Sequence, residues 1–369
     1  MTPLCAKIAF GMLGGINLST GRELLRRAGS AEGVFERGED EMVSLLGRRG
    51  TIASADYRRD IAARAAREEV FVRSSGVRAL FFADDCYPQR LLDCDDAPAL
   101  LYALGDTPLD KLRTVAIVGT RHSTAYGLDF TARLVGDLAA TYGRDIAIIS
   151  GLAYGIDVAA HRAALREGLP TVAVMANALN TVYPAEHREV AARIVRSGGM
   201  LLSEYPTSAR THRGFFLARN RIVAALADAV VVVESDQRGG AMATARIASA
   251  YGRELFAVPG RVGDARSRGC LELLATRLAS VVRDAGDIGD ALGWKPLARE
   301  GEQQELMLEL SSEQARIVEH LRNHPDATVN DMCVALALPF ASLSSALFEM
   351  EMADILMTLP GGRYAVLDR

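Results

Sequence analysis

Basic and aromatic residues lie close together in residues 212–221, in the order His-Arg-Gly-Phe-Phe-Leu-Ala-Arg-Asn-Arg. Guanidinium groups bind phosphates and rings stack on bases, for about 1–3 kcal/mol per base, so this composition is typical of a single-strand nucleic-acid groove. Arg219 and Arg221 are two positions apart, which puts them on different sides of a helix, so we expect one of them to hold a neighbouring loop or carboxylate. Either Phe215 or Phe216 could be a core ring, and we expect one of them to be exposed. The candidate ligands are Arg213, Phe216, Arg219, Asn220 and Arg221.

A second candidate site is the segment 119–127, which follows an apolar run. Arg121 stands where its guanidinium can reach a phosphate bound at a helix start near Gly127, because helix starts carry unpaired N–H groups. The alternative is a salt bridge to a carboxylate of a neighbouring loop. Ser123 and Tyr126 offer a hydroxyl and a stacking face, or are equally a cap and a core ring. The candidates here are Gly119, Thr120, Arg121, Ser123, Tyr126 and Gly127.

Two more glycine-containing loops follow apolar runs, at 150–157 and 238–246. Glycines let the backbone approach a ligand closely, and backbone amides bind anions. Their candidate ligands are Gly151, Arg238, Gly239, Gly240 and Thr244. His161 stands four residues after Asp157, but no third metal ligand or nucleophile accompanies the pair. We therefore favour a structural hydrogen bond for His161 and expect no metal site.

The elements that must position these loops are short apolar runs separated by helix-length segments. The runs are Val115–Val118, Ala147–Ile149, Val172–Met175, Leu201–Leu202, Val230–Val233 and Leu255–Val258. Runs this apolar indicate strands buried on both faces, and their alternation with helices predicts an α/β fold with a doubly wound, Rossmann-like parallel sheet. Ligands of such sheets bind beyond the carboxyl ends of the strands, where the candidate loops lie.

Standard nucleotide fingerprints are missing from the sequence. No G-x-G-x-x-G follows the first parallel strand, and the chain's three lysines, Lys7, Lys111 and Lys295, complete no G-x-x-x-x-G-K-[ST]. We expect no cofactor.

Six motifs in one order resemble the DNA-processing protein A family, the DNA-protecting protein of natural transformation. They are Gly119-Thr120-Arg121, Ser150–Ala160 with His161, Tyr183-Pro184, Ser203-Glu204-Tyr205-Pro206, Arg219-Asn220-Arg221-Ile222 and Phe256-Ala257-Val258-Pro259-Gly260. The resemblance implies a binder of single-stranded DNA that dimerises and loads the RecA recombinase, with no catalytic step. It places a homodimer interface near the helix that begins at Gly269, with Leu271, Leu274 and Leu278 as apolar contacts or, equally, as core residues.

The runner-up hypothesis is a nucleotide phosphoribohydrolase of the lysine-decarboxylase-like type, whose sheet and first loop look similar. Those enzymes use a Gly-Gly-x-Gly-Thr-x-x-Glu loop with a catalytic carboxylate. Here Ala-Met-Ala-Thr follows the glycine pair, and no Glu stands three residues after Thr244. Without a general base or nucleophile, no hydrolytic mechanism can be assigned, so we expect a binding protein and not an enzyme.

Charge is distributed unevenly along the chain. Residues 113–268 hold 19 arginines and 13 acidic residues, a net charge of +6, whereas residues 269–369 carry −8. A GC-rich genome could explain the preference for arginine over lysine, but not this asymmetry. Five scattered cysteines without a C-x-x-C pair indicate free thiols. We found no signal peptide or membrane span, and we expect a cytoplasmic protein without membrane contact.

The chain divides by pattern into four parts. Residues 1–70 resemble a helical module, of helix-hairpin-helix or sterile-alpha-motif-like type, with helices at Ile8–Leu13 and Leu24–Arg27 and an N-cap at Ser19 or Thr20. Residues 71–293 form the extended central domain, whose first segment adds strands to the sheet edge in the family. Residues 294–310 are a linker, and residues 311–369 form a winged helix.

The winged helix is predicted from three helices and a hairpin. Its third helix, Ala341–Met352, has no Arg or Lys but contains Glu349 and Glu351. Carboxylates repel a phosphate backbone, so we favour a protein-contact or dimer-regulating role over DNA binding for this domain.

Overall fold

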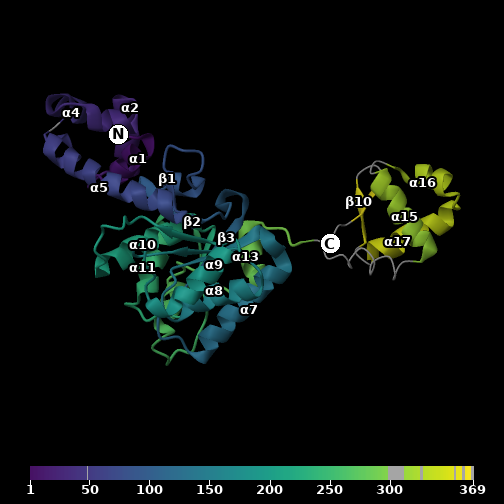
Figure 1. Ribbon diagram of the computed structural model, residues 1–369. Coiled ribbons are helices and arrows are strands. Elements are labelled where there is room, and N and C mark those ends of the chain that lie inside the picture. Colours follow the sequence, from purple (N-terminus) through teal and green to yellow (C-terminus); the bar gives the residue numbers. More distant parts are fainter. Residues whose placement is uncertain (48, 298–310, 325–326, 353–354, 360–361, 367–369) are drawn as a thin grey trace. The chain divides into compact units, whose positions relative to one another are not determined.

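The computed structural model describes residues 1–47, 49–297, 311–324, 327–352, 355–359 and 362–366, and these residues form two compact units (Figure 1). The first unit is Met1–Pro296 and the second is Leu297–Arg369. Most of the predicted linker, residues 298–310, lies outside the described residues. Trp294, at its start, packs edge-on against Tyr142 of the first unit, with ring centroids 5.6 Å apart.

A sheet of nine described strands organises the first unit, in the order β1-β2-β6-β5-β4-β3-β7-β8-β9. The strands are β1 (Arg78–Phe81), β2 (Leu100–Gly105), β3 (Arg113–Val118), β4 (Ile146–Ser150), β5 (Thr171–Val174), β6 (Met200–Ser203), β7 (Ala229–Val232), β8 (Glu254–Ala257) and β9 (Ser280–Val281). Neighbours from β6 to β9 are parallel, while β1 and β2 are antiparallel additions beside β6. The predicted doubly wound sheet with an extended edge is confirmed.

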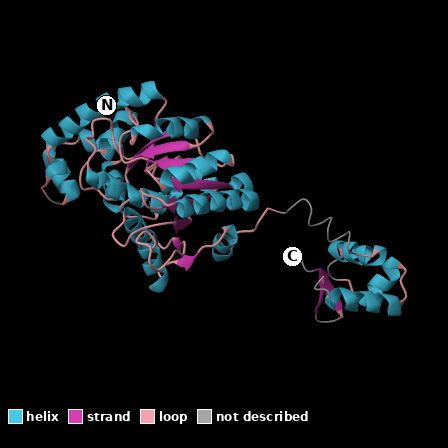
Figure 2. Cartoon of the chain, turned by 90° about the horizontal axis from the view of Figure 1, so that it is seen from below, coloured by secondary structure: helices cyan, strands magenta, loops and turns pink. Residues whose placement is uncertain are grey.

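Helices cover both faces of this sheet (Figure 2). In β3, Val115 and Ile117 pack on one face and Ala116 and Val118 on the other, which explains why the strand is apolar throughout. The first face carries α7 (Ala125–Tyr142), α8 (Ile156–Arg166), α9 (Arg188–Arg196) and α13 (Ala285–Leu292). The second carries α10 (Arg213–Leu226), α11 (Gly240–Ala250) and α12 (Arg268–Ala275).

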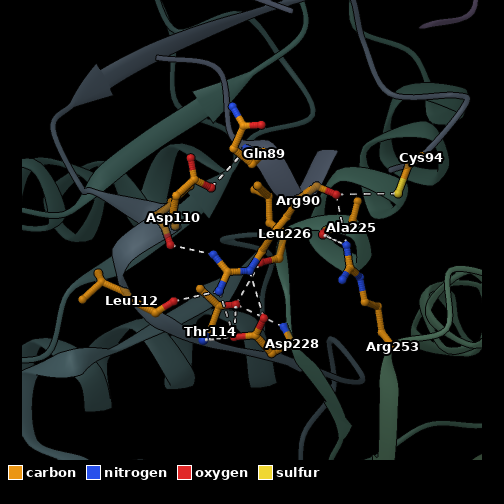
Figure 3. Close-up of polar contacts among 11 residues, drawn as sticks. Gln89, Arg90, Cys94, Asp110, Leu112, Thr114, Ala225, Leu226, Asp228 and Arg253 are labelled. Atoms are coloured by element: carbon orange, nitrogen blue, oxygen red, sulfur yellow. Dashed lines mark hydrogen bonds and ion pairs between the residues drawn. The ribbon is translucent and has the colours of Figure 1, made fainter. Parts of the chain in front are cut away.

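A clamp at the amino ends of the strands ties the extended edge to the sheet (Figure 3). Arg90, in α6 (Gln89–Leu92), donates from Nε to the Asp228 carboxylate at 2.9 Å. Its Nη1 and Nη2 donate to the carbonyl oxygens of Leu109 and Leu112, at 2.7 and 2.8 Å. Asp228 accepts the backbone N–H of Thr114 at 2.8 Å. Since all these partners lie before or at the amino ends of β3 and β7, the clamp leaves the carboxyl ends of the strands free for a site.

Among the described residues of the N-terminal module are five α-helices: α1 (Pro3–Gly11), α2 (Leu18–Ala28), α3 (Ala31–Glu36), α4 (Glu39–Leu46) and α5 (Ala55–Ser75). The predicted caps of α2, Ser19 and Thr20, are wrong, because Asn17 caps the helix by accepting the N–H of Thr20 at 2.8 Å. Helix α5 packs on α1 and also against β1, so it runs past the predicted domain boundary at residue 70 and continues onto the sheet edge (Figure 1).

The second unit has its own hydrophobic core. Its elements are α15 (Ser312–Asn323), α16 (Val329–Leu336), α17 (Phe340–Met352) and the antiparallel hairpin of β10 (Leu356–Leu359) and β11 (Arg363–Val366). The predicted winged helix is confirmed. Within the described ranges, no single helix has both the length and the apolar character needed to cross a membrane, and only the bent pair of α16 and α17 passes that test together.

Candidate nucleic-acid interface

The loops that follow the carboxyl ends of the parallel strands form one edge of the central domain, which we call the rim. It comprises residues 119–124, 151–155, 175–187, 204–212, 233–239 and 258–267, after β3, β4, β5, β6, β7 and β8, together with residues 213–216, the first turn of α10. The chain winds outward in opposite directions from β3 and β7, which are neighbours in the sheet. Doubly wound sheets bind ligands at this reversal point.

One cluster of side chains on the rim combines a cation with two rings. The guanidinium of Arg121 lies 5.3 Å from the ring centroid of Phe216, and the ring of Tyr183 meets Phe216 edge-on at 5.5 Å. Arg121 is exposed, Tyr183 is 52% exposed and Phe216 is half-buried. No ion pair of Arg121 occurs among the described residues, so the alternative of a salt bridge is not observed there. The cluster can hold a phosphate beside a stacked base.

Phe215 and Phe216 have different surroundings although both are half-buried. The ring of Phe215 stacks on Tyr205 at 3.7 Å, nearly parallel, and also contacts His212 at 4.2 Å. We expected one of the two rings to be exposed, but neither is fully exposed. Because Tyr205 already covers a face of Phe215, Phe216 is the better stacking platform.

The start of helix α7 is already filled by a carboxylate. Glu234, which is 2% exposed, accepts the backbone N–H of Thr124 at 2.9 Å and also its hydroxyl. Gly127 is buried against this side chain, where a Cβ would collide with the carboxylate. The expected phosphate at this helix start is therefore wrong, and Gly127 serves the packing of Glu234 in place of binding DNA.

Other candidates of this loop are partly engaged. The Thr120 N–H donates to the Glu234 carbonyl oxygen at 2.7 Å, and a Cβ on Gly119 would meet Ile156. Tyr126 is 47% exposed and donates its hydroxyl to the Pro259 carbonyl oxygen at 2.9 Å. Ser123 is half-buried, and the helix cap that sequence allowed for it is supplied by Thr124 instead.

Arg219 lies inside the protein, contrary to its prediction as a DNA ligand. It is 5% exposed, donates from Nη1 to the Val174 carbonyl oxygen at 2.6 Å and fills the space above Gly151. Burial lowers the pKa of Arg219, which the nearby carboxylate of Asp157 partly offsets, and burial raises the pKa of Asp157. Arg219 and Gly151 thus pack against each other below the surface of the rim and offer no group to a phosphate.

Arg221 is also turned inward. It forms an ion pair with Glu204, and both side chains are largely buried. We expected one member of the Arg219 and Arg221 pair to hold a neighbouring group, and both do. Asn220 is half-buried, with its amide nitrogen 3.5 Å from the Gly240 carbonyl oxygen.

Two further arginines remain available. Arg213, the first residue of α10, and Arg238, beside the start of α11, are exposed and have no ion pair within the described ranges. Gly240 is exposed and Gly239 half-buried. Thr244 is 2% exposed in the first turns of α11, so its predicted contact with DNA is wrong in this conformation.

The predicted structural role of His161 agrees with its contacts. His161 is fully buried and its Nδ1 lies 2.7 Å from the Thr171 hydroxyl oxygen, which in turn donates to the Ile148 carbonyl oxygen at 2.8 Å. Burial lowers the pKa of His161 from its ordinary 6.5 to about 3. No group of three or more metal-binding side chains occurs in the part of the chain that the structure describes.

The predicted dimer contacts lie at or near α12. Leu271 and Leu274 are half-buried, and Leu278 is 41% exposed. Val281, on the edge strand β9, adds another exposed apolar side chain at 46%.

Sequence reasoning missed two residues of the rim. Tyr183 was noticed only as part of a motif, although a tyrosine in the loop after β5 must lie on the same sheet edge as Arg121. Glu234 directly follows the apolar run of β7 at the reversal point, and this position could have indicated that a carboxylate occupies the place of a phosphate.

Comparison with known proteins gives consistent matches. The family profile described as DNA recombination-mediator protein A matches residues 78–293, and that of the DprA winged helix domain matches residues 303–362. A protein of Mycobacterium tuberculosis named as a DNA processing protein DprA is 41% identical over 286 residues, covering 75% of this chain and 71% of its own.

Two solved structures are similar as well. DNA processing protein A of Streptococcus pneumoniae matches with a TM-score of 0.64 and 28% identity, over 78% of this chain and 97% of its own. DNA processing protein A of Helicobacter pylori, whose structure is described by its single-stranded DNA binding mode, matches with a TM-score of 0.52 and 33% identity, over 58% of this chain and 95% of its own.

Proposed function

Because the chain belongs to the DNA recombination-mediator protein A family, we propose that it binds single-stranded DNA along the rim. The observation that carries this proposal is the cluster of Arg121, Phe216 and Tyr183, together with the exposed Arg213 and Arg238, which form no ion pair among the described residues. Guanidiniums that lack a protein counter-ion gain most from a phosphate, and exposed rings gain from a base. The single-stranded DNA binding described for the relative from Helicobacter pylori supports the same ligand.

Binding of this kind depends on salt and little on sequence. Arginines bound to phosphates release counter-ions, so affinity falls steeply with salt. Stacking on Phe216 or Tyr183 accepts any base because every base has a π face. A flexible single strand can place bases on these rings, whereas the bases of a duplex stay stacked on one another.

The test is fluorescence anisotropy with a labelled oligothymidylate, a mixed-sequence single strand and a matched duplex. We expect the two single strands to bind with similar affinity, and the duplex more weakly. Preference for the duplex at all salt concentrations would contradict the proposal.

At the level of the cell, we propose that the protein protects incoming single strands and loads RecA on them during natural transformation, as a homodimer. The family description as a recombination mediator supports the role, and the exposed Leu278 and Val281 next to α12 support the dimer. The assay is RecA nucleation on single strands coated with a single-strand-binding protein. Addition of this protein should shorten the lag, and an unchanged lag would contradict the role.

We propose binding and not catalysis. Glu234, the carboxylate at the reversal point, is buried and already accepts hydrogen bonds from Thr124, so it is poorly placed to act as a general base on a nucleotide. Incubation with nucleoside monophosphates should therefore release no free base. Release of base that depends on Glu234 would favour the nucleotide phosphoribohydrolase.

A further inference from the structure

The loop that leads into α10 is held at its two ends by ring contacts and an ion pair, but its middle has few hydrogen bonds to the rest of the described protein. It spans residues 204–212, between β6 and the first residue of α10, Arg213. Its beginning is fixed by Tyr205, whose N–H donates to the Ser203 hydroxyl at 3.1 Å, and its end by His212, which caps α10 by accepting the N–H of Gly214 at 3.1 Å. Between these ends, Ser208, Arg210 and Thr211 are exposed, and Pro206, Thr207 and Ala209 are half-buried.

The middle of this loop is anchored by a carboxylate from the N-terminal module. Glu68 of α5 accepts the backbone N–H of Thr207 at 2.9 Å with both oxygens, and its Oε2 also accepts the Thr207 hydroxyl at 2.5 Å. Within the described ranges, these are the hydrogen bonds that join residues 206–211 to the rest of the protein; the other backbone bond, from the Ala209 N–H to the Pro206 carbonyl oxygen, is internal.

Glu68 is specifically placed for this contact. It is 2% exposed and lies on the same face of α5 as Ile61, Ala65 and Val72, which are apolar and buried. No ion pair of Glu68 is found among the residues that the structure describes. A buried carboxylate without a cation depends on its hydrogen-bond donors, so Glu68 and Thr207 hold each other in place.

The charge of Glu68 also influences Tyr102, which pairs with the end of the strand that precedes the loop. Burial and, secondarily, the Glu68 carboxylate raise the pKa of Tyr102, and Tyr102 in β2 pairs with Ser203, the last residue of β6. The same carboxylate therefore acts electrostatically on Tyr102, beside the strand end, and binds the middle of the loop that leaves it. The beginning of α10, with Arg213 and Phe216, follows a few residues later.

We infer that Glu68 is a positioning residue through which the N-terminal helical module sets the loop 204–212 and the first turn of α10 for binding of single-stranded DNA. The inference rests on the proposed function, because the N-terminal module would affect DNA binding only by positioning residues of the proposed DNA site. Glu68 is buried and touches no ligand itself. Without the anchor, residues 206–211 sample many conformations in the free protein, and binding must order them at a cost in affinity.

The test uses the full chain with Glu68→Ala, Glu68→Gln and Thr207→Val. Hydrogen exchange of residues 204–212 is measured without DNA, and affinity is measured with a labelled oligothymidylate. Glu69→Gln is the matched control, because it makes the same charge change as Glu68→Gln on the same helix, while the hydrogen bonds of the Glu69 side chain within the described ranges go to Thr2 and Arg73 and not to the loop. Thr207→Val keeps the backbone N–H that binds Glu68 and removes only the hydrogen bond of the hydroxyl. This milder variant still tests the inference if Glu68→Ala does not fold.

We expect Glu68→Ala to speed exchange across the loop and to weaken binding by about tenfold, since a hydrogen bond to a charged group contributes on that order. Thr207→Val should show a smaller change of the same kind, and Glu68→Gln should partly rescue because its carbonyl oxygen still accepts. Glu69→Gln should match the wild type in both measurements.

A double-mutant cycle separates positioning from a general loss of structure. In the Glu68→Ala background, Arg213→Ala should cost less affinity than in the wild type, whereas Arg238→Ala, after a different strand, should cost the same in both. Wild-type affinity of folded Glu68→Ala and Thr207→Val, or full additivity with Arg213→Ala, overturns the inference. If the wild-type chain binds no single strand, the proposed function fails and the inference about binding fails with it, while the exchange data still decide whether Glu68 orders the loop.

Discussion

Arg121 and Arg219 carry the same guanidinium but serve different ends because their surroundings differ. Arg121 is exposed over the ring of Phe216, whereas Arg219 is buried and donates from Nη1 to a backbone carbonyl oxygen. Residue type alone made both of them candidates for phosphate binding. Exposure, which the tertiary structure decides, separates the proposed DNA ligand, Arg121, from Arg219, which supports the fold.

Replacement of Phe216 by alanine tests the stacking platform. We predict a loss of about 1–3 kcal/mol in binding to oligothymidylate, with an unchanged salt slope, because a ring contributes stacking and releases no counter-ions. Anisotropy titrations at several salt concentrations measure both quantities. Phe348→Ala, which removes a ring that is 63% exposed in the second unit, serves as the control and should bind like the wild type. Equal losses in the two variants would refute the assignment of Phe216.

Replacement of Arg219 by alanine should act on stability. The variant loses the hydrogen bond to the Val174 carbonyl oxygen and leaves Asp157 without its nearby cation, so we predict a decrease of about 2–3 kcal/mol in the free energy of unfolding. Urea denaturation gives this value. The salt slope of the folded variant should equal that of the wild type, and a shallower slope at unchanged stability would show that Arg219 contacts phosphate after all.

His161 makes stability depend on pH. Burial lowers the pKa of His161 to about 3 in the folded protein. The unfolded chain therefore protonates this ring as the pH falls below the ordinary pKa of 6.5, whereas the folded chain protonates it only near pH 3. The contribution of the neutral ring is thus complete above pH 6.5 and is lost as the pH falls, by at most about 1.4 kcal/mol per pH unit. Unfolding free energies at pH 7.0, 6.0 and 5.0 should fall less steeply for His161→Gln than for the wild type, and parallel curves would contradict this account.

At the scale of elements, the apolar pattern was enough to predict the strands and their parallel arrangement. All six predicted runs overlap observed strands, since a strand buried on both faces must be apolar at every position. The start of α7 could not be predicted in the same way. A helix start following a glycine-containing loop indicates an anion site, but the anion here is Glu234, which lies 107 residues after Gly127 in the sequence.

The sequence was enough to predict where the candidate site lies, but not which of its residues are exposed. The carboxyl ends of parallel strands share one edge, so the loops that contain Arg121, Arg213 and Arg238 were correctly placed on one rim. Sequence could not show that Arg221 pairs with Glu204, or that Thr244 is buried in α11, because both depend on how α10 and α11 pack on the sheet. Local spacing contains no information on such long-range packing.

At the scale of the whole molecule, positive charge is concentrated in the middle of the chain, with +6 in residues 113–268 against −8 in residues 269–369. The third helix of the winged helix, α17, has no Arg or Lys and exposes Phe348 and Met352, at 63% and 72%. Apolar and acidic groups at this position disfavour a phosphate backbone and suit a protein contact.

Removal of residues 297–369 tests this division. We predict that the truncated chain, which keeps the compact first unit, binds oligothymidylate with the same salt slope as the full chain and with an affinity within about threefold, because no phosphate contact is lost. Anisotropy titrations on both chains give the comparison. A markedly shallower slope after truncation would place DNA contacts on the winged helix.

The central claim is that exposed guanidiniums of the rim bind the phosphates of a single strand. The most direct measurement is the dissociation constant for oligothymidylate against salt concentration, for the wild type and for the triple variant Arg121→Ala, Arg213→Ala and Arg238→Ala. The control triple variant, Arg133→Ala, Arg166→Ala and Arg283→Ala, removes as much charge from exposed arginines that form surface ion pairs. We predict that the log–log slope becomes shallower by about 2 in the rim variant alone, since each phosphate contact in a single strand contributes about 0.7. Equal slopes in the rim variant and the wild type would contradict the account.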